Sequence, residues 1–100
     1  MFVDVVQTDG AVALQVHGEL DLATADALRR AVDGAGRDPR DDVVMDLSAV
    51  TFVDCAGLRA VLRSVRSARH RGQTMSVTGT SSCVSRLSTA CGVGGALRTH

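Results

Sequence analysis

The sequence has no tryptophan, tyrosine or lysine, and its only phenylalanines are Phe2 and Phe52. With so few rings, we expect a core built from valine, leucine and alanine. Arginine supplies all the formal positive charge, and 11 basic residues balance 11 acidic ones, so the net charge is zero. Nucleic-acid binders usually carry an excess of positive charge on one face. The charge balance therefore predicts no direct contact with nucleic acid.

Long hydrophobic runs are also missing. No stretch approaches the roughly 18 apolar residues of a membrane-spanning helix, so we expect no membrane insertion. The first residues lack the basic region and long apolar core of a signal peptide. Both absences favour a cytoplasmic location. Hydrophobic residues still make up 45% of the chain, enough for a packed core, and the 100 residues predict one domain over 1–100.

Paired cysteine motifs are the third absence. Cys55, Cys83 and Cys91 are odd in number and none stands in a CxxC pair. This spacing disfavours a disulfide framework and a zinc site, so no metal is predicted. The sequence contains no glycine-rich loop with a lysine, so no nucleotide cofactor is predicted. No histidine is placed in the sequence to activate a cysteine nucleophile, and we do not expect an enzyme.

Hydrophobic periodicity predicts strands and helices in turn. Strands near 2–6 and 12–17, joined through Asp9-Gly10, form an antiparallel hairpin. A helix follows, with Thr24 as its N-cap and Gly34 near its end. The apolar run at 42–47 is typical of a strand covered on both faces.

The second half of the chain repeats the alternation. A helix is predicted over about 56–71, a short strand over 74–79, and a third helix capped by Ser81 or Ser82. The order is β-β-α-β-α-β-α, in the α/β class. Crossovers through helices impose parallel pairing, so we expect a small mixed sheet with the helices packed on it.

Three phrases in this order resemble the STAS domain family and, within it, the single-domain anti-sigma-factor antagonists. They are GELDLATADAL at 18–28, VVMDLSAVTFVDCAGLRAVL at 43–62 and SVTGTSSCVSRLSTACGV at 76–93. Together they span nearly the whole chain. The resemblance implies a non-enzymatic module, monomeric or weakly dimeric. Such a module binds an anti-sigma factor with an ATP-binding kinase fold and so releases a sigma factor.

The resemblance also implies that Cys55 stands at a regulatory position of the family. In the family, the residue after the acid of the second phrase is usually a serine or threonine. The partner kinase phosphorylates it, and the modified form does not bind. Here Cys55 holds that position and Ala56 follows, so the resemblance implies that the usual phosphorylation switch is missing.

Several interpretations of Cys55 stay open. Cysteine is close to serine in shape and tolerates burial, so it could be a silent replacement. Oxidation of the thiol could instead replace phosphorylation as a bulky modification, which would make the protein a redox-responsive regulator. A disulfide with Cys83 or Cys91 would need Cα atoms within about 7 Å. A further alternative for the whole chain is a STAS regulatory subunit of a transport or lipid-trafficking assembly.

The predicted partner surface lies where 20–24 and 54–62 meet at one edge of the fold. Its expected contact residues are Asp21, Leu22, Thr24, Asp54, Cys55, Ala56, Gly57, Leu58, Arg59 and Leu62. The two acids also suit helix capping, since each stands just before a helix. Arg59 and Arg63 begin an arginine stripe at helical spacing, which is either a solvated face or a surface that steers an acidic partner. Gly57 is expected to allow close packing.

Overall fold

The computed structural model describes residues 1–8, 10–35 and 42–92. Its elements, in chain order, are β1 (Phe2–Thr8), β2 (Ala11–Leu20), α1 (Ala25–Ala35), β3 (Asp42–Val53), α2 (Cys55–His70), β4 (Met75–Thr80) and α3 (Ser82–Ala90). The predicted α/β class and element order are confirmed. Asp9 of the predicted turn lies outside the described residues, as do the loop at 36–41 and the tail at 93–100. Of the helices described, none is both long and apolar enough to cross a membrane.

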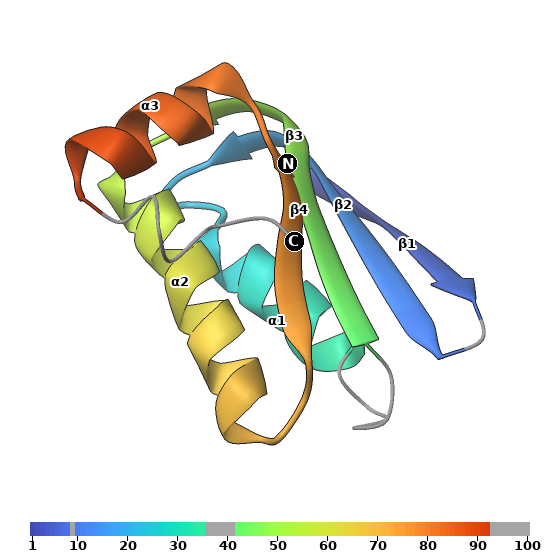
Figure 1. Cartoon of the computed structure of the whole chain (residues 1–100). Helices are drawn as coiled ribbons and strands as arrows, with labels where there is room; N and C mark the ends of the chain where they lie inside the picture. The colour runs from blue at the N-terminus through green and yellow to red at the C-terminus, as the bar shows by residue number, and fades with distance from the viewer. Residues whose placement is uncertain (9, 36–41, 93–100) are drawn as a thin grey trace.

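The four strands form one mixed sheet in the order β1-β2-β3-β4. β1 pairs antiparallel with β2 through the predicted hairpin, whereas β2–β3 and β3–β4 are parallel. Each parallel pair is joined by a crossover helix, as parallel pairing requires. Figure 1 shows α1 and α2 side by side along the sheet, with α3 at the end where β3 leads into α2.

The core lies between the sheet and the helices and contains no aromatic ring. Alternate residues of β2 supply it, because Val12, Leu14 and Val16 are buried while their neighbours turn away. Phe2 and Phe52 are 59% and 49% exposed. Valine and leucine dominate as predicted, but methionines contribute more than expected. Alanine adds less than expected, since among the buried hydrophobic residues it is represented by Ala68 alone in the described part.

β3 is twice as long as the sequence predicted. We expected it to end at Leu47, but it continues to Val53. Its second half pairs with the end of β2 through register shifts, next to Gly18, whose φ is +92°. These irregularities hide the two-residue alternation that reveals a regular strand. The extension carries the chain straight to the first residue of α2. The other predicted element boundaries differ from those of the structure by at most three residues.

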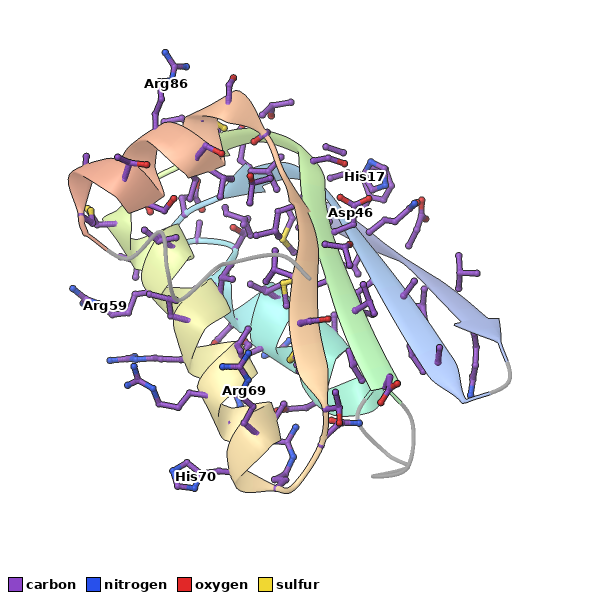
Figure 2. The ribbon with its side chains drawn as sticks, in the orientation of Figure 1. His17, Asp46, Arg59, Arg69, His70 and Arg86 are labelled. Atoms are coloured by element: carbon purple, nitrogen blue, oxygen red, sulfur yellow. The ribbon has the colours of Figure 1, made fainter. Side chains whose placement is uncertain are left out.

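The opposite face of the sheet carries a small polar cluster. The ring of Phe2 stacks on His17, with centroids 4.4 Å apart, and His17 Nε2 lies 3.2 Å from Asp4 Oδ2. Hydrogen bonds from Ser48 hold the pKa of Asp46 below its ordinary value of 3.8, and His17 adds a smaller effect. His17 and Asp46 lie together in Figure 2. This cluster is on the face away from the helices and from the predicted partner edge.

Candidate functional site

The start of α2 is fixed by Asp54. This residue ends the extended strand with φ −112° and ψ −179°, and its Oδ1 accepts a hydrogen bond of 2.8 Å from the N–H of Gly57. Its backbone carbonyl accepts the first helical bond, from Leu58. Its own N–H donates to the carbonyl of Leu20 at the end of β2 (3.1 Å). The predicted capping role of Asp54 is confirmed, and the cap is tied to the neighbouring strand.

Gly57 lets α2 approach β2 closely. A Cβ placed on this residue would lie far inside the van der Waals contact distance of the Leu20 carbonyl and 2.9 Å from Leu20 Cβ. No L-residue with a side chain fits there without moving backbone. The predicted close-packing role is therefore confirmed, and the first turn of α2 rests directly on the end of β2.

The loop before α1 is closed by a reciprocal pair. The N–H of Asp21 donates to Thr24 Oγ1, and the N–H of Thr24 donates to Asp21 Oδ1, both at 3.0 Å. The Thr24 hydroxyl also donates to the carbonyl of Glu19 (3.0 Å). Thr24 does stand at the N-cap position, because its carbonyl accepts the first helical bond from Leu28. Its hydroxyl, however, binds the loop, contrary to the expected cap, and the side chain of Leu22 is left 79% exposed.

A groove of about 440 Å³ separates α1 from α2 and begins at this loop. It is lined by Leu22, Ala25, Asp26, Arg29, Asp33, Ala56, Arg59, Ala60, Arg63, Ser64, Ser67 and Arg71. Three predicted contact residues therefore share one hollow, namely Leu22, Ala56 and Arg59. Sequence reasoning missed the side contributed by α1. The charged spacing of Asp26, Arg29 and Asp33 on one helix face was its signal.

The groove carries more positive than negative charge. Four arginines line it against two aspartates. Arg29 lies 3.5 Å from Asp26 and 3.8 Å from Asp33, which also pairs with Arg71. Within the described part of the chain, Arg59 and Arg63 have no carboxylate at ion-pair distance. The uncompensated charge thus lies on α2, where the arginine stripe was predicted.

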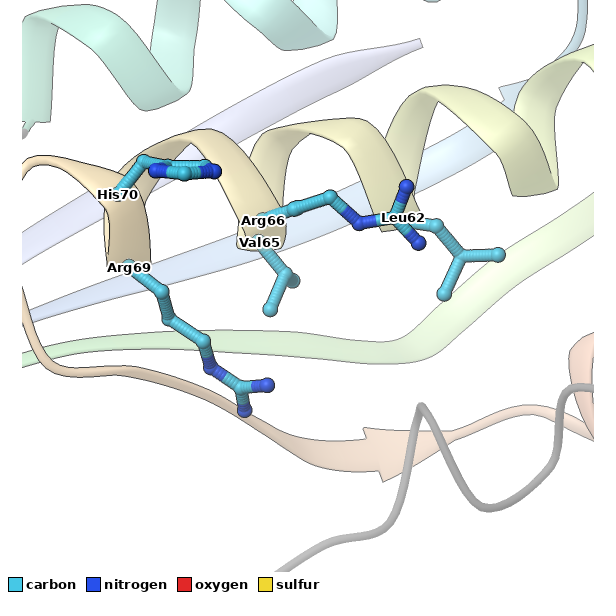
Figure 3. Close-up of a pocket in the computed structure, with 5 residues that line it drawn as sticks. All are labelled: Leu62, Val65, Arg66, Arg69 and His70. Atoms are coloured by element: carbon cyan, nitrogen blue, oxygen red, sulfur yellow. The ribbon is translucent and has the colours of Figure 1, made fainter.

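The remaining predicted contacts are placed differently. Leu58 is 3% exposed and belongs to the core, and Gly57 is buried beneath the first turn, so neither offers side-chain surface. Leu62 is half-buried and lines a second hollow with Val65, Arg66, Arg69 and His70, as Figure 3 shows. Asp21, Thr24 and Asp54 act in the loop bonds described above. The exposed part of the predicted surface therefore consists of Leu22, Cys55 and Arg59, and Ala56 is half-buried.

The cysteines fall into two groups. Cys83 is half-buried, and its thiol lies 3.4 Å from the carbonyl of Val50 and 3.1 Å from the hydroxyl of Ser81. Cys55 and Cys91 are exposed. Partial desolvation, followed by the neighbouring Cys55 thiol, raises the pKa of Cys91. The fold therefore places these two thiols near one another.

Part of the sequence is similar to that of a known anti-sigma-factor antagonist. The anti-sigma-F factor antagonist RsfB of Mycobacterium tuberculosis is 40% identical over 57 residues, which is 57% of this chain and 47% of RsfB. The match thus spans about half the length of this relative.

Two solved structures resemble nearly the whole chain. An anti-sigma factor antagonist from Mycobacterium paratuberculosis superposes with a TM-score of 0.80 and 26% identity, covering 99% of this chain and 84% of its own. The unphosphorylated antagonist SpoIIAA gives a TM-score of 0.74 at 18% identity, covering 99% and 88%, and so supports the fold. The family described as STAS domain matches residues 2–99. The chain therefore belongs to the STAS domain family.

Proposed function

We propose that this protein is an anti-sigma-factor antagonist, which binds an anti-sigma factor and thereby frees a sigma factor. The named function of its relatives supports the proposal. The observation that carries it on this chain is the edge formed by Leu22 and the first turn of α2. There a large apolar side chain, 79% exposed, shares a groove with Ala56, the residue that follows the exposed Cys55. Exposed apolar side chains next to a hollow are typical anchors for a protein partner.

The partner in this proposal is an anti-sigma factor with an ATP-binding kinase fold. Leu22 and Ala56 provide the apolar contact, while Arg59 and Arg63 attract an acidic segment of the partner. Asp54 and Gly57 support this surface by holding the first turn of α2 in place. The protein works by binding in the cytoplasm, as a monomer or weak dimer. It performs no catalysis and uses no cofactor, nucleic acid or membrane insertion.

Phosphorylation is not the control mechanism in this proposal. A phosphate would place nearly two negative charges at the start of α2, next to Asp54. Cys55 and Ala56 have no hydroxyl to receive it, and a serine kinase does not normally modify a thiol. The antagonist would therefore stay competent to bind in the presence of ATP and the partner kinase.

The test is a titration of each anti-sigma factor of the encoding organism with this protein, followed by an assay for sigma-factor release. We expect one anti-sigma factor to bind and release its sigma factor. Cys55→Asp, which adds a charge at the modification position, should weaken that binding more than tenfold, about 1.4 kcal/mol.

Gln7→Asp is the matched control, because Gln7 is exposed and pairs with Val12, at the other end of β2 from Leu20. It should leave binding unchanged. Failure to bind any anti-sigma factor would refute the proposal. Capture of a transport or lipid-trafficking component instead would support the regulatory-subunit alternative. Equal binding by Cys55→Asp and the unmodified protein would remove Cys55 from the contact surface.

A further inference from the structure

Cys55 is the first residue of α2, and its side chain is exposed. The preceding Asp54 and the buried Gly57 fix the backbone on which the thiol stands, through the cap and the contact with Leu20. The sulfur is therefore presented to solvent from a rigid position. An accessible thiol of this kind can be reached by a small oxidant.

Cys91 is presented from the other side of the same contact. It is the C-cap of α3, where its N–H donates to the carbonyl of Leu87 (2.9 Å), and its thiol is also exposed. Figure 1 shows the last turn of α3 beside the first turn of α2, and these helices are in contact. Because Cys55 begins α2 and Cys91 directly follows α3, this contact places the two exposed thiols at adjoining helix ends, and the Cys55 thiol is near enough to act on the pKa of Cys91.

The third cysteine does not compete for this pairing. Cys83, near the start of α3, packs against the hydrophobic core and lies close to the carbonyl of Val50 and the hydroxyl of Ser81. Two of the three thiols are thus exposed and adjacent, while the other is held elsewhere. A disulfide needs Cα atoms about 4.4 to 6.8 Å apart, and neighbouring thiols at two helix ends that are in contact suit that requirement.

We propose that Cys55 and Cys91 form a reversible disulfide on exposure to hydrogen peroxide, and that this bond switches off partner binding. The Cys55 sulfur attacks the peroxide, so an S–O bond forms, the O–O bond breaks and one water leaves. The Cys91 sulfur then attacks the Cys55 sulfur, so the S–S bond forms, the S–O bond breaks and a second water leaves. Two thiols are oxidised, one peroxide is reduced, and a dithiol restores both thiols by exchange.

The switch itself rests on the proposed function, but the disulfide does not. Oxidation turns the Cys55 sulfur toward α3 and holds the end of α3 against the first turn of α2. That turn carries Ala56 and Arg59, which line the groove beside Leu22. A partner that must cover Cys55 then meets a fixed cross-link in place of a small, free thiol. Oxidation would thus do at this position what an added phosphate does in relatives of the antagonist type.

The chemistry is tested first, on the full chain without any partner. The reduced protein is treated with one equivalent of hydrogen peroxide, alkylated, digested and mapped by mass spectrometry. We expect a Cys55–Cys91 cross-link that consumes two of the three free thiols and leaves one, Cys83, open to alkylation. Cys55→Ser and Cys91→Ser should each abolish the cross-link, and the matched control Cys83→Ser should retain it. A cross-link to Cys83, or none within one chain, would overturn the proposal.

The consequence is then measured as the Kd for the anti-sigma factor before and after oxidation. We expect binding at least about tenfold weaker after oxidation, with recovery in dithiothreitol. Cys91→Ser, which lies outside the predicted contact residues, should bind equally well before and after the same treatment. Equal binding by reduced and cross-linked protein would overturn the switch. A mapped disulfide in a protein that binds no anti-sigma factor when reduced would overturn the proposed function and leave the disulfide standing.

Discussion

The two junctions that meet at the proposed partner edge begin alike and end differently. Each places an aspartate after a strand and before a helix. The Asp54 carboxylate accepts a hydrogen bond from an N–H in the first turn of α2, whereas the Asp21 carboxylate accepts one from the N–H of Thr24. Behind Asp54, Gly57 packs the helix onto Leu20, while beyond Asp21 the loop leaves Leu22 in solvent. One junction is a rigid support, and the other presents a side chain. An acid before a helix therefore does not by itself identify which role its junction has.

The sharpest way to break the rigid junction is Gly57→Ala. The added methyl would overlap the Leu20 carbonyl, so either α2 or β2 has to move. We expect the free energy of unfolding to fall by about 3 kcal/mol, the upper end for overpacking. Urea denaturation followed by circular dichroism measures the loss. Gly34→Ala on α1 is the matched control, because nothing lies within 4 Å of a Cβ there. It should be neutral or stabilise by up to about 1 kcal/mol. Equal losses in both variants would contradict the close packing.

Removal of the cap tests the same junction more gently. Asp54→Ala should lower the free energy of unfolding by about 1 kcal/mol, because the N–H of Gly57 loses its partner. Asp54→Asn should keep most of the stability, since asparagine caps nearly as well. The internal comparison is Ser81→Ala, because Ser81 is the N-cap of α3 and makes no side-chain cap bond. Its effect should stay within about 0.5 kcal/mol. A loss from Ser81→Ala as large as that from Asp54→Ala would show that the hydrogen bond between Asp54 and Gly57 is not the source of the stability.

Changes in the loop before α1, which leaves Leu22 exposed, should affect partner binding more than stability. Leu22→Ser removes a side chain that is 79% exposed, so the free energy of unfolding should change by less than about 0.5 kcal/mol. Binding to the anti-sigma factor should nevertheless weaken tenfold or more, because the apolar anchor is lost. Val6→Ser, at an exposed valine on β1, should alter neither quantity. A variant of Leu22 that unfolds easily would show that this residue supports the fold, and unchanged binding would move the partner surface elsewhere.

Short sequence patterns predicted the junction between β3 and α2 well. An acid just before the helix indicated the cap, and a glycine in its first turn indicated the close approach; both were found. The same reasoning failed at Thr24, because a hydroxyl at an N-cap has several hydrogen-bond partners in reach. Here the hydroxyl accepts from the N–H of Asp21 in place of a helix N–H, and it donates to the carbonyl of Glu19. The length of β3 was missed because register shifts against β2 removed the alternation that marks a strand.

Features that depend on packing between helices were beyond the sequence. The groove needs α1 beside α2, and only that arrangement sets Arg29 across from Arg59. The adjacency of Cys55 and Cys91 needs the end of α3 beside the start of α2. Spacing along the chain named Cys83 and Cys91 as equal candidates, and the packing of α3 distinguishes them. Burial likewise separated Leu58, a core residue, from its exposed neighbour Arg59.

The ring-free core has a practical optical consequence. Without tryptophan or tyrosine, the protein absorbs almost nothing at the wavelengths used for most protein spectroscopy, and its two phenylalanines lie at the surface. In a mixture, any tryptophan fluorescence therefore belongs to the partner. An anti-sigma factor with a tryptophan near the contact would report binding, oxidation and release from its own emission, against a dark background and without a label on either protein.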